Sequence, residues 1–249
     1  MIKNNRHDII IREVRIHNRV LLNDLAILLN VSIDTVRRDI IELDQEKKLK
    51  RIHGGAQAKG YQPFNYTNNE VYSHEQKITI ANKAAKLVHP NSISLISGGT
   101  SNLELVRVLP KDIKATFFTP SLPIAMQLLE HKSIEVVFLG GRLSKSSQIA
   151  LGGSVLNALA EIKFDNCFLG TSYLDIGNGL TESDWEVVQL KKAMIRSSNR
   201  IISLAISEKL GTVQRYKICD IENINTLITE LSPKDSKLNP YHNLGLQIL

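Results

Sequence analysis

Apolar residues recur along this chain with two different spacings, and the spacing changes near residue 75. Before that point, short apolar stretches follow the 3.6-residue repeat of amphipathic helices. After it, compact apolar runs typical of buried strands alternate with helical patterns. The pattern therefore predicts a small helical head at residues 1–57 and an α/β body at residues 75–249. A polar linker is expected between them, at residues 58–74.

The head contains three segments with helical periodicity. Ile9, Ile10 and Val14 predict a first helix, and the leucines of "NDLAILLN" predict a short second one. The stretch "RVLL" between them is typical of a short strand. A tight turn then leads into "SIDTVRRDIIEL", where Ser32 stands at the position of an N-cap. Two short helices joined by a tight turn predict a helix-turn-helix.

The third helix has one apolar and one polar face. The apolar residues, which we expect to be buried, are Ile33, Val36, Ile40 and Leu43. The polar face carries Asp34, Arg38 and Glu42. Paired arginines on such a helix form either a solvated face or a contact with an anionic partner. If this helix enters the major groove, Arg38 is placed to contact bases, and Arg37, on the flank, to contact phosphates.

A basic hairpin is expected directly after this helix. The short strand "LKRI" is followed by Gly54 and Gly55, which suit a tight turn or a close backbone approach. Basic residues surround the strand: Lys47, Lys48, Lys50, Arg51 and His53. Helices, short strands and a basic hairpin in this order predict a winged helix, whose wing contacts the DNA backbone or the minor groove.

The stretch "VSIDTVRRDIIELDQEKKLKRIHGGA", residues 31–56, resembles the N-terminal signature of the DeoR family of bacterial transcription repressors. The resemblance implies a double-stranded operator DNA as partner. It also implies that the DNA-binding residues are Ser32, Asp34, Thr35, Arg37, Arg38, Arg51, His53, Gly54 and Gly55. Asp39 is expected to have a structural role, organising the neighbouring arginines through a salt bridge.

The distribution of charge agrees with a head that binds nucleic acid. Residues 1–60 hold 12 Lys and Arg against 8 Asp and Glu, whereas the remaining residues hold 19 against 17. The two cysteines, Cys167 and Cys219, form no metal-binding motif, and Cys167 is expected to be a buried thiol. With no apolar stretch long enough to span a bilayer and no signal peptide, a cytoplasmic protein without membrane contact is expected.

The alternation of strands and helices in the body predicts a mainly parallel sheet. In such sheets, ligands bind beyond the carboxyl ends of the strands. The expected strand ends are rich in Gly, Ser and Thr: "SGGTS", "TPS", "LGG" and "LGTS". Each of these loops could simply form a tight turn, but several of them on one edge favour a binding site for a phosphorylated small molecule.

The body also resembles the sugar-phosphate-sensing domain of the DeoR family, in segments such as "ISGGTSN", "VVFLGGRL" and "GLTESDWEVVQLKKAMI". That domain is similar to the ribose-5-phosphate isomerase fold. The resemblance implies that the effector-binding residues are Gly98, Gly99, Thr100, Ser101, Thr119, Ser121, Gly140, Gly141, Thr181, Glu182, Lys191 and Lys209. From the sequence alone, Lys191 could also be a solvated helix residue and Glu182 a helix cap.

Two positions depart from the family pattern. Ser97 and Ile206 stand where the family has acidic residues, which disfavours an isomerase because aldose–ketose isomerisation requires a positioned base. Without these carboxylates, binding of a different ligand and a loss of sensing are both left open as alternatives. We therefore expect a DNA-binding regulator, most simply a homo-oligomeric (dimeric or tetrameric) repressor of carbohydrate-metabolism genes controlled by a phosphorylated sugar. No catalytic residue, metal or other cofactor is expected; an isomerase-like enzyme and a non-sensing regulator are the alternatives.

Overall fold

The computed structural model describes residues 3–17, 19–58, 72–145 and 147–249. The chain forms two compact units, Met1–Tyr72 and Ser73–Leu249, and each is described by itself. Most of the linker expected at residues 58–74 lies outside the described residues. None of the helices in the described ranges has the length and apolar character needed to cross a membrane.

The first unit is a winged helix-turn-helix, as the sequence predicts. Its elements are α1 (Lys3–His17), β1 (Arg19–Leu21), α2 (Leu22–Leu29), α3 (Ile33–Gln45), β2 (Lys50–Ile52) and β3 (Gly55–Gln57). The three strands form an antiparallel sheet in the order β1-β3-β2. Apolar side chains from all three helices form one buried cluster, centred on Ile10, Leu25, Val36 and Ile40. Burial of this cluster holds the helices and the wing together.

Local signals determine where α3 begins. Asn30 ends α2 in the left-handed conformation, with φ of 51°, which Asn tolerates better than most residues. The Ser32 hydroxyl accepts a hydrogen bond from the backbone N–H of Thr35 at 3.2 Å, which confirms the predicted N-cap. The expected burial of Ile33 is wrong, because this first residue of the helix lies at the edge of the apolar face and is 41% exposed.

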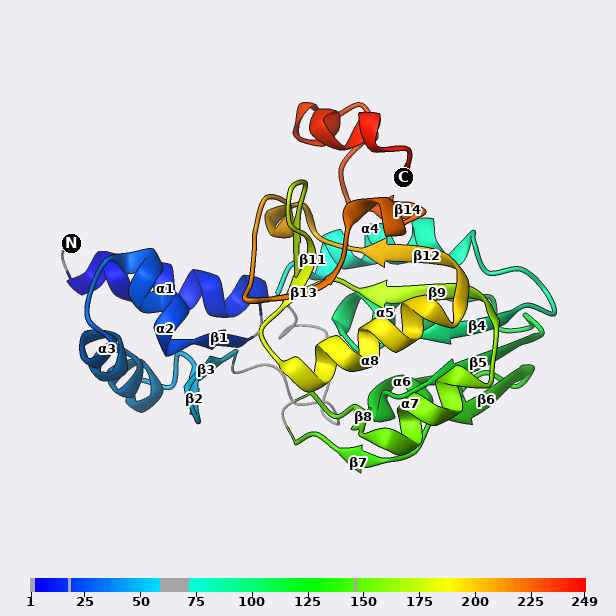
Figure 1. Ribbon diagram of the computed structural model, residues 1–249, viewed down its shortest axis with the longest axis horizontal. Coiled ribbons are helices and arrows are strands. Elements are labelled where there is room, and N and C mark those ends of the chain that lie inside the picture. Colours follow the sequence, from blue (N-terminus) through cyan, green and yellow to red (C-terminus); the bar gives the residue numbers. More distant parts are fainter. Residues whose placement is uncertain (1–2, 18, 59–71, 146) are drawn as a thin grey trace. The chain divides into compact units, whose positions relative to one another are not determined.

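The second unit contains a seven-stranded parallel sheet in the order β15-β14-β12-β9-β4-β5-β6 (Figure 1). The strands in chain order are β4 (Ile93–Ile96), β5 (Ala115–Thr119), β6 (Ile134–Phe138), β9 (Phe164–Gly170), β12 (Ser198–Leu204), β14 (Thr226–Ile228) and β15 (Gln247–Ile248). All neighbouring strands in this sheet pair in parallel. This arrangement confirms the predicted α/β class, and it places the carboxyl ends of the strands at one edge.

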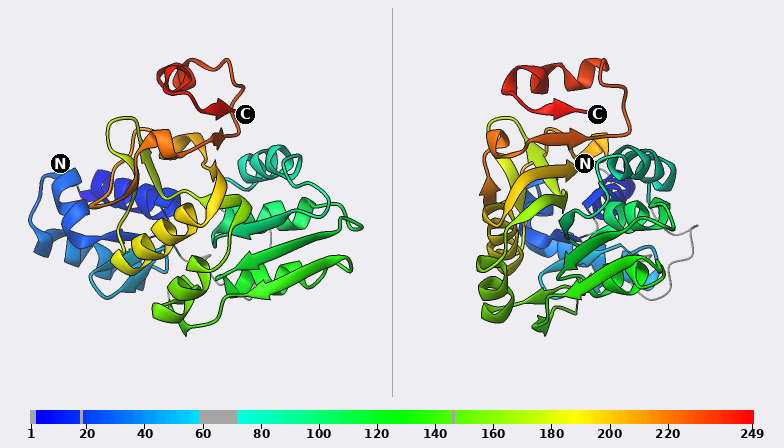
Figure 2. Two further views of the ribbon diagram at one scale, coloured as in Figure 1. Left: turned by 45° about the vertical axis from the view of Figure 1, so that its right-hand side comes forward. Right: turned by 90° about the vertical axis from the view of Figure 1, so that its right-hand side faces the viewer.

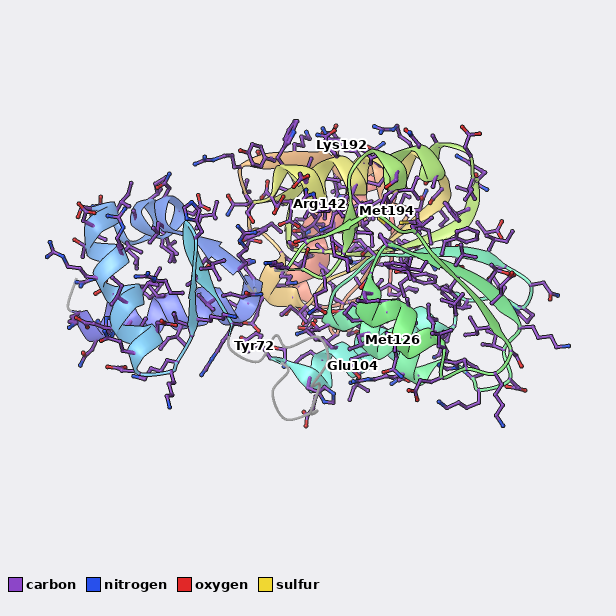
Figure 3. All side chains as sticks on the ribbon, turned by 90° about the horizontal axis from the view of Figure 1, so that it is seen from below. Tyr72, Glu104, Met126, Arg142, Lys192 and Met194 are labelled. Carbon is purple, nitrogen blue, oxygen red and sulfur yellow. The ribbon has the colours of Figure 1, made fainter. Side chains whose placement is uncertain are left out.

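Helices cover both faces of the parallel sheet (Figures 1 and 2). One face carries α4 (His74–Ala85), α5 (Thr100–Val108) and α6 (Leu122–Leu128), and the other carries α7 (Gly153–Ala160) and α8 (Trp185–Arg196). Figure 3 shows the same separation, with Glu104 and Met126 on one side and Lys192 and Met194 on the other. The Cys167 side chain is fully buried in β9, as predicted.

Several smaller elements were not expected from the sequence. Strands β10 (Tyr173–Asp175), β11 (Gly179–Glu182) and β13 (Tyr216–Cys219) form a separate antiparallel sheet, and β7 (Arg142–Leu143) pairs with β8 (Ala150–Leu151). Short 3₁₀ helices lie at η2 (Ser207–Lys209), η3 (Ile221–Asn223) and η4 (Ser236–Leu244). The last strand, β15, has two residues and pairs with β14 at the sheet edge. A strand of two residues is too short to show the alternation of apolar and polar positions by which strands are predicted.

Candidate functional site

The exposed face of α3 carries the charged residues expected to meet DNA. Asp34 and Arg37 form an ion pair one turn apart on the surface of the helix. Arg38 is exposed and forms no ion pair with any residue in the described ranges. The hydroxyls of Ser32 and Thr35 lie 2.9 Å apart and hydrogen-bond to each other. The guanidinium of Arg38 is therefore the one on this helix that needs no rearrangement before it binds a new partner.

Asp39 does not organise the neighbouring arginines, which corrects the sequence-based expectation. Its carboxylate accepts hydrogen bonds from Arg6 of α1, at 2.8 Å to Nε and 3.0 Å to Nη2. His7 Nε2 lies 3.2 Å from the same carboxylate, which is 2% exposed. Burial acts to raise the pKa of Asp39, but Arg6 and His7 outweigh it and hold the pKa below its usual value. Asp39 does not pair with Arg37 or Arg38 because its side chain faces α1, whereas both arginine side chains project to solvent.

Glycine is required at the two wing positions for different structural reasons. Gly54 has φ of +75°, which the turn between β2 and β3 requires. A Cβ atom on Gly55 would lie 1.9 Å from the carbonyl oxygen of Val20, so β3 can approach β1 only without a side chain there. The backbone N–H of Arg51 donates to Asp44 Oδ1 at 2.9 Å and ties the wing to the end of α3. The wing is thus held in a fixed position against α3.

A groove lies between α3 and the wing and brings several of the expected residues together. It is lined by Leu22, Arg37, Ile40, Arg51, Ile52, His53, Gly54 and Gly55. Arg51 and His53 are exposed on the wing, and Arg37 faces them from α3. The head therefore presents a concave basic surface, whose charge suits a phosphate backbone.

In the second unit, hydrogen bonds join the loops at the carboxyl edge of the sheet. Thr119, at the end of β5, donates its hydroxyl to the carbonyl of Ile96 in β4 at 2.7 Å. The hydroxyl of Ser97 accepts from the backbone N–H of Gly170 at 2.7 Å and so joins β4 to β9. Lys209 Nζ donates to the carbonyl of Thr171 at 2.6 Å, which joins the loop after β12 to β9. These contacts hold the loops after β4, β5, β9 and β12 together at the edge of the sheet where the effector cleft is expected.

The glycine-rich loop after β4 opens onto this edge. Gly99 has φ of +117°, a conformation that favours glycine, and α5 begins at Thr100. A Cβ atom on Gly98 would lie 3.3 Å from Ser121 Oγ, so these two residues are neighbours. The loop therefore directs backbone N–H groups of a helix N-terminus toward the cleft, together with the partly exposed Thr100 and the nearly buried Ser101.

A buried ion pair lies near Lys209 at this edge of the sheet. Lys191 Nζ lies 2.9 Å from Glu182 Oε2, and both side chains are about nine-tenths buried. Ser172 donates its hydroxyl to the same carboxylate at 2.7 Å. Burial acts to raise the pKa of Glu182, but Lys191, Ser172 and the Ser183 N–H together hold it below its usual value. Lys191 is thus not a solvated residue.

The other sequence-predicted cleft residues have mainly structural contacts. Glu182 belongs to β11 and is not the cap of α8, a role that Asp184 fills. The hydroxyl of Thr181 accepts from the backbone N–H of Gln214 at 2.8 Å. Ser154 donates its hydroxyl to the carbonyl of Gly140 at 3.3 Å, and a Cβ atom on Gly141 would lie 2.9 Å from the Leu151 carbonyl. Gly140 and Gly141 thus contact β8 and α7.

The sequence interpretation missed Lys77, a cation of this cleft. Lys77 lies on α4 and is 6% exposed, in line with the buried Ile80, Ala81 and Ala84. Burial lowers its pKa to about 8, against the charges of Glu104 and Glu208. A lysine at a core position of an amphipathic helix was the available signal, because buried lysines are rare.

Lys209 is the centre of the cationic cluster. Burial and, to a lesser extent, the charges of Lys77 and Lys191 together lower its pKa to about 7, and Glu182 opposes them. The carbonyl that Lys209 contacts belongs to Thr171, and the preceding Gly170 packs on the carbonyl of Gly98. The cluster therefore lies close to the glycine-rich loop, and Glu182, Glu104 and Glu208 are the carboxylates that oppose its positive charge.

The two departures from the family pattern have different consequences. The Ser97 hydroxyl is used within the fold, since it accepts from Gly170 N–H and from Asn102 Nδ2, at 2.7 and 3.1 Å. Ile206 is 1% exposed and buried in the core. Neither position offers a carboxylate to the cleft, so the groups left to meet a ligand are the lysines, the Glu182 pair and the loop.

Comparison with known proteins identifies both units. One family model, the DeoR-like helix-turn-helix domain, matches residues 6–60, and another, the DeoR C terminal sensor domain, matches residues 72–231. The HTH-type transcriptional regulator GolR of Listeria innocua is 27% identical over 234 residues, 93% of this chain and 92% of that protein. The HTH-type transcriptional repressor GlcR of Bacillus subtilis is 28% identical over 242 residues, 94% of this chain and 90% of that protein.

Solved structures share less sequence identity with this chain than these regulators do. Ribose 5-phosphate isomerase A from Methanocaldococcus jannaschii has a TM-score of 0.40 and 18% identity, over 54% of this chain and 53% of that chain. The translation initiation factor eIF-2B from Pyrococcus horikoshii has a TM-score of 0.46 and 13% identity, over 93% of this chain and 83% of that chain. The curated relatives, by contrast, are named as regulators or repressors and not as enzymes. With a sensor-domain model that matches more than half of its length, the chain belongs to the DeoR family of transcriptional regulators.

Proposed function

We propose that this regulator is a cytoplasmic, homo-oligomeric repressor of carbohydrate-metabolism genes, and that a phosphorylated sugar controls its affinity for operator DNA. The observation that carries the proposal is the cluster of Lys77, Lys191 and Lys209 beside the glycine-rich loop. Residues 1–57 bind the operator, and residues 75–249 bind the sugar and assemble the oligomer. A two-fold oligomer matches the symmetry of palindromic operators.

The like charges of the three lysines support a phosphate group on the ligand. Lys191 is paired with Glu182, and the charges of Lys77 and Lys191 both lower the pKa of Lys209. Lys209 and Lys77, on which Glu104 and Glu208 also act, match an anionic phosphate group. The Glu182 carboxylate, with Ser172 beside it, is placed to hold sugar hydroxyls. The same residues argue against a regulator that has lost sensing, because a buried cationic cluster without a ligand is costly to keep.

For an inducer, the thermodynamic requirement is a difference in sugar affinity between the DNA-bound and DNA-free arrangements. The test is a mobility-shift titration of the full chain on DNA from its own upstream region, without and with phosphorylated sugars. A thermal-shift screen identifies the sugar first, because a ligand that binds the native state raises the melting temperature. The proposal fails in its DNA part if no salt-sensitive, sequence-specific shift appears, and in its effector part if no phosphorylated sugar stabilises the protein.

The two adjacent arginines of α3 are expected to contribute differently to DNA binding. Arg38→Ala should flatten the discrimination between operator and unrelated DNA by about 1–3 kcal/mol, because Arg38 is exposed and placed for base contact. Arg37→Ala should weaken binding to both DNAs equally and reduce the salt slope by about one, because Arg37 lies in the groove beside the wing. Fluorescence anisotropy at several salt concentrations measures both. The opposite assignment would mean that α3 is rotated in the groove.

Sugar-phosphate affinity is expected to fall as the pH rises from 7 to 9. In the free protein the pKa of Lys209 is about 7 and that of Lys77 about 8, so both lose protons in this range. A bound phosphate dianion raises both pKa values, so binding takes up protons and weakens as protons become scarce. Titration calorimetry at pH 7, 8 and 9 should show at least a tenfold loss overall. An affinity independent of pH would contradict the placement of the phosphate beside these lysines.

A further inference from the structure

Ile33 is an apolar residue that the fold of the head leaves exposed instead of buried. It is the first residue of α3, directly after the Ser32 cap, and it is 41% exposed. Among the described residues of the head, the apolar side chains that are buried in the core or packed against it do not include Ile33. Packing within the head therefore gives no reason for an isoleucine at this position.

The surroundings of Ile33 belong to the DNA-binding face. Arg37 follows Ile33 by one helical turn, so the two side chains share a flank of α3. Arg37 and Ile40 continue that flank into the groove that the wing closes. The polar side chains at the start of the helix contact one another: Ser32 and Thr35 hydrogen-bond to each other, and Asp34 forms an ion pair with Arg37. Ile33 is thus an exposed apolar side chain at the N-terminal end of the same flank of α3 that carries Arg37 into the groove.

Resting on the proposed binding of α3 to operator DNA, we propose that Ile33 contacts the 5-methyl group of a thymine and selects a T·A pair at one position of each half-site. The first turn of the second helix in a helix-turn-helix lies at the base edges of the major groove. The thymine methyl is the apolar group that these edges offer, and an aliphatic side chain is its natural partner. Ile33 would then add sequence preference that the arginines cannot supply.

Replacing thymine by deoxyuracil tests this contact, because deoxyuracil lacks the methyl group and keeps every hydrogen-bonding group. The operator is first selected from a random duplex library with the full chain. Symmetric thymines in the two half-sites are then replaced one pair at a time, and binding is measured by fluorescence anisotropy. The matched control is Ile27→Ala, since Ile27 is an isoleucine of the same head, on α2, and is 78% exposed.

For the wild-type chain, one thymine pair should lose roughly fourfold in affinity per half-site, the factor that corresponds to about 0.8 kcal/mol per methyl-sized group buried. Ile33→Ala should bind the thymine operator more weakly by a similar factor. Deoxyuracil at that thymine pair should no longer change its affinity, whereas deoxyuracil at every other pair should act as it does on the wild type. Ile33→Val, which keeps branched methyl groups, should retain the sensitivity. Ile27→Ala should reproduce the wild-type profile.

An Ile33→Ala profile that matches the wild type at every thymine would overturn the proposal. A variant that binds DNA normally but changes its oligomeric state would assign Ile33 to a contact between subunits and overturn it as well. Failure of the wild-type chain to select any duplex is a separate result, which would count against the proposed function itself. Melting temperatures of the variants should equal that of the wild type, because the substituted side chains are exposed.

Discussion

Replacing Asp39 by alanine should destabilise the head by about 3–5 kcal/mol and abolish operator binding at physiological temperature. Asp39 is 2% exposed, forms an ion pair with Arg6 and lies within hydrogen-bond distance of His7, and the side chains of both partners are largely buried. Its removal takes away the carboxylate that Arg6 hydrogen-bonds through two nitrogens at a largely buried position, which costs more than the original pair contributed. Calorimetry of the full chain should resolve the loss as a shift of the transition that belongs to the head.

The control for this prediction lies on the same helix. Asp34 also forms an ion pair with an arginine, but its side chain is 69% exposed and that of Arg37 54% exposed. Solvent screens exposed pairs, so Asp34→Ala should change the unfolding free energy by no more than about 0.5 kcal/mol. If Asp39→Ala and Asp34→Ala had the same melting temperature, the contact of Asp39 with Arg6 would not be what holds α1 on α3. Joint replacement of Asp39 and Arg6 by leucine and methionine should recover much of the lost stability.

The local signals of the head were readable from sequence, and the long-range partners were not. The Ser32 cap and the Gly54 turn each depend on residues within a few positions, so composition and spacing predict them. The partner of Asp39 comes from α1, 33 residues earlier, and no local pattern encodes that pairing. The helical periodicity that correctly placed Val36 and Ile40 in the core also misplaced Ile33, because periodicity cannot tell how far a buried face extends toward a helix end.

The parallel sheet was predictable because its apolar strands alternate with helices, whereas the assembly of the cleft was only partly so. Residues of the glycine-rich loop are adjacent in sequence and form one turn. The lysine cluster instead joins α4, α8 and η2, which lie far apart along the chain. The resemblance to a family supplied Lys191 and Lys209, but Lys77 is visible only as a charged residue in an apolar stripe. Such a conflict between pattern and residue type is itself an indication of function.

Replacing Lys77 by methionine should weaken sugar-phosphate binding by about 10- to 100-fold, and Lys209→Met should do the same. A charge-assisted contact to a phosphate is lost in each case, and burial leaves little room for water to replace it. Neither variant should lose affinity for operator DNA, because neither lysine belongs to the head. Both should therefore bind DNA in a form that the sugar no longer releases, which a mobility-shift titration detects.

Stability separates a binding role from a structural one. In the free protein, burial and the like charge of Lys77 lower the pKa of Lys209, so the native state is strained by these cations. Lys77→Met should thus leave the melting temperature of the free protein unchanged or raise it, as is common for residues kept for function. Lys83, on the same helix, donates to the carbonyls of Thr229 and Leu231, both at 2.7 Å. Lys83→Met should lower the melting temperature and keep the sugar response, and a Lys77→Met protein with that same behaviour would make Lys77 a structural residue.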